Sequence, residues 1–157
     1  SDLPLVSVIT DRVNYQEIDK PQKYDFHELT NICIFLGLVS TVFDFMFFAV
    51  FFPLGEELVR TLWFVASVLT ELAIIFSIRT KFFFLKGGSP SLPLMIISFL
   101  AGLITILVSF TKLGVIFHFA QPPISTLFII ISLVILYLLT TEFIKLLYYH
   151  KKIKALI

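Results

Sequence analysis

Acidic side chains lie inside or beside stretches of this sequence that are otherwise almost entirely apolar. Asp44, Glu71 and Glu142 are the three clearest cases. A charged side chain at the centre of a bilayer costs about 2.5–3.5 kcal/mol to insert, so a retained one is expected to face a bundle interior, a cavity or an ion path. Carboxylate oxygens suit Mg²⁺ and Ca²⁺, and a carboxylate can also carry a proton. These residues are therefore the first candidates for chemistry.

Glu71 is the most informative of the three. Trp63, Ser67 and Glu71 are spaced four residues apart and share one stripe of a helix, and Thr70 lies beside them. A carboxylate with hydroxyl neighbours offers hard oxygen ligands to Mg²⁺, Ca²⁺ or a proton. We expect such a role for Glu71. The alternative is a protonated acid that hydrogen-bonds a neighbouring helix and serves only the structure.

The other two acids favour structural interpretations. Ser40 and Thr41 precede Asp44 by four and three residues, a spacing that predicts a local hydrogen bond without any ligand. Glu142 and Lys145 are three residues apart near the end of an apolar stretch, and we expect a solvated or snorkelling pair there.

A proline near the beginning of the chain carries a different signal. In Asp2-Leu3-Pro4 the proline follows an acid inside a short apolar run. Proline interrupts the hydrogen-bond ladder of a helix and frees carbonyl groups, and interrupted membrane helices are places where transporters coordinate ions. Asp2 is therefore a second candidate ligand.

Composition indicates the elements that must position these residues. The 157 residues are 58% hydrophobic, with a mean hydropathy of +0.98, which exceeds what a soluble domain can bury. A helix needs about 20 residues to cross a bilayer. The single cysteine, Cys33, excludes an intrachain disulfide and is expected to be a small buried hydrophobe. We predict an all-α integral membrane bundle with four spans: Asn31 to Phe52, Leu58 to Ile78, Leu92 to Thr111, and Ile124 to Tyr148.

The distribution of charge predicts the topology. All but two of the 12 Lys and Arg residues fall before the first span, between the second and third, or at and beyond the C-terminal end of the fourth, and the exceptions are Arg60 and Lys112. Basic residues near span ends are retained in the cytoplasm, so both termini are expected there, in a multi-pass protein of the plasma membrane (the cell inner membrane). Residues 1–10 are predicted to be the end of a truncated membrane helix, 11–30 a cytoplasmic loop, and 31–157 the four-helix transmembrane domain. The net charge of +1 does not favour a nucleic-acid partner.

Several short runs of the sequence form a pattern: Ser-Asp-Leu-Pro-Leu-Val-Ser at 1–7, Phe-Asp at 43–44, Leu-Thr-Glu-Leu at 69–72, Ile-Arg-Thr at 78–80 and Ser-Leu-Pro-Leu at 91–94. Together these runs resemble P-type cation-transporting ATPases, and most closely their magnesium-translocating branch. The resemblance covers nearly the whole chain, from the end of the sixth membrane helix to the tenth. Its most specific parts are Phe43-Asp44 in the first span and Ile78-Arg79-Thr80 at the end of the second.

The resemblance implies a function for the segment. Asp2 would match the acidic ligand of the unwound sixth helix, and Glu71 a ligand of the eighth, in a pump that moves Mg²⁺, with Ca²⁺ or another cation as alternatives. Residues 11–28 would contact the phosphorylation domain and couple it to the ion site. Other transmembrane helices, that domain and the lipid bilayer would be the partners.

ATP chemistry is not expected from this segment alone. The sequence contains neither an Asp-Lys-Thr-Gly phosphorylation motif nor a Gly-rich phosphate cradle, so ATP and its Mg²⁺ would act only through other domains. We expect the chain to be an excerpt of a longer pump. The main alternative is a free-standing four-helix membrane protein that acts as an assembly factor or channel subunit. A lipid-modifying enzyme is disfavoured because no His/Asp cluster stands at an interface.

Overall fold

Four long helices dominate the structure, a computed structural model that describes residues 2–11, 26–80, 82–85 and 88–155. A short helix, α1 (Asp2–Ser7), precedes them and continues as the 3₁₀ turn η1 (Val8–Thr10). The described residues contain no β-strand, so the predicted all-α class is confirmed. The long helices are α3 (Phe26–Phe51), α4 (Glu56–Ile78), α5 (Leu92–Phe110) and α6 (Ile124–Ala155).

Each long helix contains a stretch that is long and apolar enough to cross a membrane. These stretches agree with the four predicted spans to within two residues at each end: Thr30–Leu54, Glu56–Ile78, Leu92–Phe110 and Ile124–Tyr149. The predicted cytoplasmic loop, 11–30, falls largely outside the described residues, and its last part already belongs to α3, which begins at Phe26.

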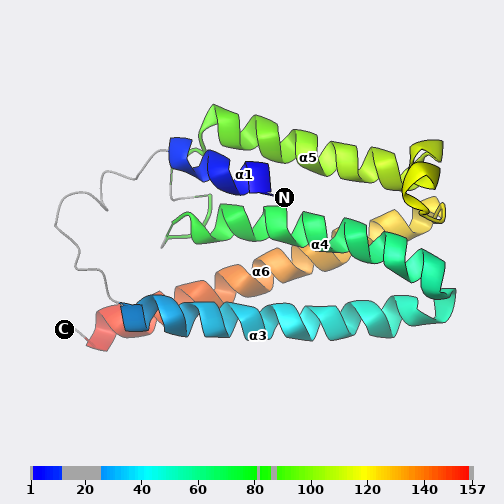
Figure 1. The fold of residues 1–157 in the computed structure, drawn as a ribbon. Coiled ribbons are helices and arrows are strands. Elements are labelled where there is room, and N and C mark those ends of the chain that lie inside the picture. Colours follow the sequence, from blue (N-terminus) through cyan, green and yellow to red (C-terminus); the bar gives the residue numbers. More distant parts are fainter. Residues whose placement is uncertain (1, 12–25, 81, 86–87, 156–157) are drawn as a thin grey trace.

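Helix α4 lies at the centre of the bundle. It contacts α1 and α5 on one side and α3 and α6 on the other, and α6 also packs along α3 (Figure 1). The beginning of α3, the end of α4, the beginning of α5 and the end of α6 lie at the same end of the bundle. Helix α1 begins part-way along the bundle and runs toward that end.

Local sequence explains where the helices stop and start. Between α3 and α4 the turn η2 (Phe52–Leu54) contains Pro53 and is followed by Gly55, whose φ of 93° and ψ of 158° are accessible essentially to glycine alone. Before α5, the Ser91 hydroxyl accepts a hydrogen bond from Leu94 N at 3.4 Å and caps the helix. The turn η3 (Lys112–Phe117) links α5 to Pro122-Pro123 and α6.

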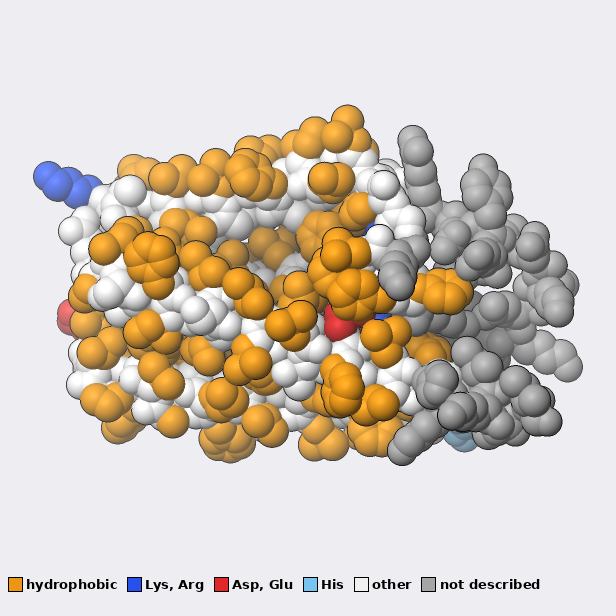
Figure 2. Space-filling model, turned by 180° about the vertical axis from the view of Figure 1, so that it is seen from behind, with side chains coloured by type: hydrophobic (Ala, Val, Ile, Leu, Met, Phe, Trp, Pro, Cys, Tyr) orange, Lys and Arg blue, Asp and Glu red, His pale blue; other side chains and the backbone are white. Residues whose placement is uncertain are grey.

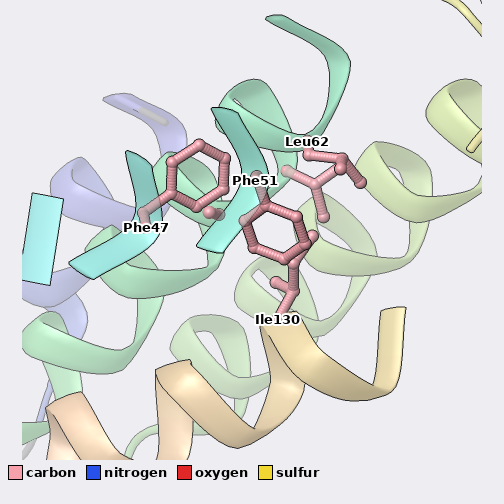
Figure 3. Packing of buried hydrophobic residues seen from close by; sticks show 6 residues of the cluster. Phe47, Phe51, Leu62 and Ile130 are labelled. Carbon is pink, nitrogen blue, oxygen red and sulfur yellow. The ribbon is translucent and has the colours of Figure 1, made fainter. Parts of the chain in front are cut away.

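The core is a cluster of large apolar side chains between α3, α4 and α6. Phe47 and Phe51 of α3 pack toward Leu62 of α4 and Ile130 of α6 (Figure 3). Phe51 is 1% exposed, and Leu62 and Ile130 are fully buried. Helix α5 packs differently, because Gly102 brings its backbone close to Leu72, a small-residue contact typical of membrane helices.

The outer surface is apolar as well. Hydrophobic side chains cover the visible face along the length of the bundle, and few charged ones interrupt them (Figure 2). Phe45, Phe99 and Phe128 are each more than 65% exposed, as expected for side chains that face lipid. Cys33 is exposed on α3 rather than buried, so that prediction was wrong.

Candidate cation-binding site

A cavity of about 280 Å³ lies between α3, α4 and α6, next to the core cluster. Part of its wall is apolar and includes Phe47, Trp63 and Ile130. The remainder carries hydroxyl and carboxyl groups from all three helices: Ser40, Asp44, Ser67, Thr70, Glu71 and Tyr137. Both carboxylates belong to candidate membrane spans, so the cavity gathers oxygen atoms at membrane depth.

Glu71 lies where the helical spacing predicted, in line with Ser67 and Trp63 on one face of α4. All three line the cavity, and the Glu71 side chain is half-buried. Asp44 reaches the same cavity from α3, and its side chain is exposed in this chain. Two carboxylates on different helices can hold one cation between them or share a proton.

The two α4 hydroxyl groups that line the cavity already donate their protons to backbone carbonyls. Ser67 donates to the Phe64 carbonyl at 3.1 Å, and Thr70 donates to the Ala66 carbonyl at 2.9 Å. The lone pairs of these oxygens are therefore what the hydroxyls can still offer, and they accept but do not donate. Such oxygens suit a cation or the protons of its hydration water.

Tyr137 lines the cavity from α6 and connects this helix to α3. Its hydroxyl lies 2.9 Å from the Ser40 hydroxyl, so the two form a hydrogen bond between α6 and α3. The Tyr137 ring also meets Phe43 edge to face, with centroids 5.3 Å apart. On the opposite side, Trp63 stacks on Phe48 at 4.9 Å. Aromatic packing thus fixes the shape of the cavity between the helices that carry the acids.

The expected local hydrogen bond of Asp44 is not formed within the described part of the chain. Ser40 bonds to Tyr137 instead, and the Thr41 hydroxyl donates to the Gly37 carbonyl at 3.0 Å. Sequence reasoning therefore missed Asp44 as a cavity residue, and Tyr137 with it. One signal was available: the spacing of Ser40 and Asp44 on α3 repeats that of Ser67 and Glu71 on α4.

Asp2 occupies a different place from Glu71. It lies in the first turn of α1 with its side chain exposed in this chain, and it does not line the cavity. Helix α1 packs on α5 and α4, whereas the cavity opens between α4, α3 and α6. The Pro4 carbonyl accepts a hydrogen bond from the Ser7 hydroxyl at 2.6 Å. The structure does not bring the two predicted ligands together within this chain.

The Glu142–Lys145 pair differs from the sequence prediction. Glu142 is 1% and Lys145 2% exposed, so the pair is buried and neither solvated nor snorkelling. Lys145 Nζ donates to Glu142 Oε1 and to the Ser77 carbonyl, both at 2.7 Å, and Phe84 N donates to Glu142 Oε2 at 3.3 Å. The pair is buried because it binds backbone groups at the end of α4 and in the following connection.

Among the described residues, no group of three or more His, Cys, Asp or Glu side chains is placed to hold a metal ion. A cation in the cavity would therefore rely on Glu71, Asp44, hydroxyl oxygens and water, or on groups from outside these helices.

The sequence is similar to those of known proteins. Residues 3–147 match the family model described as "Cation transporting ATPase, C-terminus". The chain is 26% identical over 151 residues to a protein named magnesium-transporting ATPase, P-type 1, from Escherichia coli (strain K12), and 25% identical over 151 residues to the protein of that name from Salmonella typhimurium (strain 14028s). Each alignment covers 92% of this chain and 17% of the relative, so the chain spans about a sixth of the relatives' length.

Proposed function

The chain belongs to the C-terminal family of cation-transporting ATPases, and on this premise we propose that it forms the C-terminal membrane part of an ATP-driven P-type cation pump. The family predicted from the sequence is confirmed, and a free-standing assembly factor or channel subunit is not favoured. In the proposed pump, phosphorylation in another domain drives the movement of other helices against these four. The four helices support the ion-binding site and form part of its lining.

The cavity that joins Glu71 to Asp44 is the observation that carries this proposal. It brings the half-buried Glu71, the exposed Asp44 and several hydroxyl oxygens together within the length of the membrane spans, where an acid without a cation or proton would be costly. Glu71 is the proposed ligand of this cavity. Asp44 lies where it can bind the same ion or its water shell.

The chemistry of the cavity favours Mg²⁺, and its size admits the hydrated ion. This ion gives up its water reluctantly and usually keeps several water molecules beside one or two carboxylates, whereas Ca²⁺ takes six to eight oxygen ligands. A Mg²⁺ ion with six waters needs on the order of 200 Å³, at about 30 Å³ per water. The cavity of about 280 Å³ can hold such an ion. The names of the relatives point to the same cation.

Asp2 is proposed as a ligand that faces the rest of the pump. Because α1 begins part-way along the bundle and the Asp2 side chain is exposed in this chain, it is available to transmembrane helices outside the chain. Asp2 and Glu71 would then line different parts of one ion path.

We propose the plasma membrane as the location, with both ends of the four-helix unit in the cytoplasm. Arg79 and Lys145 lie near the bundle end at which α4 ends and α5 begins, while Arg60, near the start of α4, and Lys112, in η3, lie at the opposite end. Basic residues retained in the cytoplasm support this orientation. The coupling loop proposed at 11–28 would contact the phosphorylation domain from the cytoplasmic end.

The test is cation transport by the full-length pump in membrane vesicles. Glu71→Gln and Asp2→Asn should each raise the Mg²⁺ concentration for half-maximal transport by about tenfold or more, because each removes a charged oxygen ligand. Glu56→Gln is the matched control, since Glu56 is exposed in the first turn of α4. If the Mg²⁺ concentration for half-maximal transport is unchanged in both variants, Glu71 and Asp2 are not ligands.

A further inference from the structure

A second set of polar contacts joins three segments at the end of the bundle where α4 stops and α5 starts. Asp11 follows η1, and its Oδ2 accepts a hydrogen bond from Arg79 Nη1, just after α4, at 2.8 Å. Its Oδ1 accepts a hydrogen bond from Ser91 N, at the start of α5, at 2.7 Å. One carboxylate thus binds two helices that flank it.

Further contacts support this carboxylate. The Thr10 and Ser91 hydroxyls are 3.2 Å apart, and Arg79 Nη2 donates to the Gly88 carbonyl. Asp11 N donates to the Val8 carbonyl at 2.9 Å and closes η1. The described helical segment that begins with α1 therefore ends in a network that also holds the end of α4 and the cap of α5.

Burial makes these contacts costly to open. The Arg79 side chain is 2% exposed and the Asp11 side chain 10% exposed. Separating the pair would leave the Arg79 guanidinium with the Gly88 carbonyl but without its carboxylate, in a site that admits little water, and an unpaired buried charge is strongly unfavourable. Ser91 N would lose its acceptor at the same time. A contact that opened in every transport cycle would incur this cost each time.

We propose that Asp11, Arg79 and Ser91 form a permanent polar anchor that holds the end of α1 to α4 and α5 throughout the transport cycle. The inference rests on the proposed pump function and adds to it two positioning residues, Asp11 and Arg79. The anchor holds residue 11, at which the proposed coupling loop begins, in a fixed position. Any movement of α1 is then a rotation about its anchored end.

A reversible cross-link tests whether the anchor stays closed. Thr10→Cys and Ser91→Cys are introduced together into the full-length pump, with Cys33→Ser to remove the native thiol of this segment. The disulfide should form both in the Mg²⁺-loaded pump and in the phosphorylated pump, and oxidised protein should transport Mg²⁺ within about twofold of the same sample after reduction. Failure of the disulfide to form in either state, or a larger loss that reduction reverses, would overturn the proposal.

Single substitutions test the positioning role. Asp11→Ala and Arg79→Ala should each lower the amount of Mg²⁺ transported per ATP hydrolysed by at least about threefold, and the double variant should be no worse than either single one because both remove the same interaction. Arg60→Ala is the matched control, since exposed Arg60 also donates to a backbone carbonyl, that of His118, at 3.0 Å. If the amount of Mg²⁺ transported per ATP hydrolysed is unchanged in both Asp11→Ala and Arg79→Ala, the positioning role of these residues is refuted.

The two proposals fail differently. If the full-length wild-type protein moves no cation, the proposed function is refuted. If the wild-type pump is active but oxidation stops the Thr10→Cys/Ser91→Cys variant, only the anchor proposal is refuted.

Discussion

The buried Glu142–Lys145 ion pair allows a quantitative prediction about stability. Lys145→Met keeps an unbranched apolar stem but removes the ammonium group that bonds Glu142 and the Ser77 carbonyl at 2.7 Å. Glu142, 1% exposed, would keep only the 3.3 Å contact with Phe84 N among the hydrogen bonds described for it. Breaking a buried pair by removing one partner costs about 3–5 kcal/mol.

The expected change in melting temperature follows from that free energy. For a chain of this size, 1 kcal/mol shifts the midpoint by about 2–4 °C, so Lys145→Met should lower it by about 6–20 °C. Thermal unfolding of the purified chain in mild detergent can be followed by loss of helical circular dichroism and by the fluorescence of Trp63, the only tryptophan. The double variant Glu142→Leu with Lys145→Met should recover part of the loss, because it leaves no unpaired charge.

Lys112→Met provides the control, since the same substitution is made at an exposed lysine. It should change the free energy of unfolding by less than about 0.5 kcal/mol. If Lys145→Met and Lys112→Met melted at the same temperature, the inference that the Glu142–Lys145 pair is buried and bound to α4 would be refuted.

Three further substitutions test the packing of the bundle by the same melting experiment. Gly102→Leu should cost about 1–3 kcal/mol by overpacking, since even a Cβ there would lie 3.5 Å from Leu72 Cδ1, while Gly102→Ala should be nearly neutral; equal midpoints for the two would contradict this. Tyr137→Phe should lose about 0.5–1.5 kcal/mol with its 2.9 Å hydrogen bond to Ser40, and an unchanged midpoint would show that the bond contributes nothing. Gly55→Ala should cost about 1–3 kcal/mol because of the φ of 93°, and a stabilised variant would refute the strain argument.

The spans and the Glu71 stripe could be predicted from the sequence because both depend on local properties. Length and hydropathy located all four spans. Pro53 with Gly55, and Pro122 with Pro123, mark chain reversals between them. The helical repeat placed Trp63, Ser67 and Glu71 on one face, and the cavity lies on that face.

The partners of the charged residues could not be predicted, because they come from distant parts of the chain. Arg79 binds Asp11 across 68 residues, and Lys145 binds the Ser77 carbonyl across 68 residues. Spacing along one helix indicated only that Glu142 and Lys145 could meet each other. Whether that pair faced water or the bundle depended on how α6 packs against the end of α4, which no local pattern contains.

The location of the bound cation in crystals shows whether Glu71 is a ligand. Mn²⁺ also binds carboxylate, carbonyl and water oxygens and scatters X-rays anomalously, so it can replace Mg²⁺ in crystals of the full-length pump. We expect an anomalous peak in the cavity between α3, α4 and α6, from an ion that the Glu71 carboxylate binds directly or through one water. A cation bound elsewhere in the transmembrane region, with Glu71 in contact neither with the ion nor with the ion's water shell, would show that Glu71 is not a ligand.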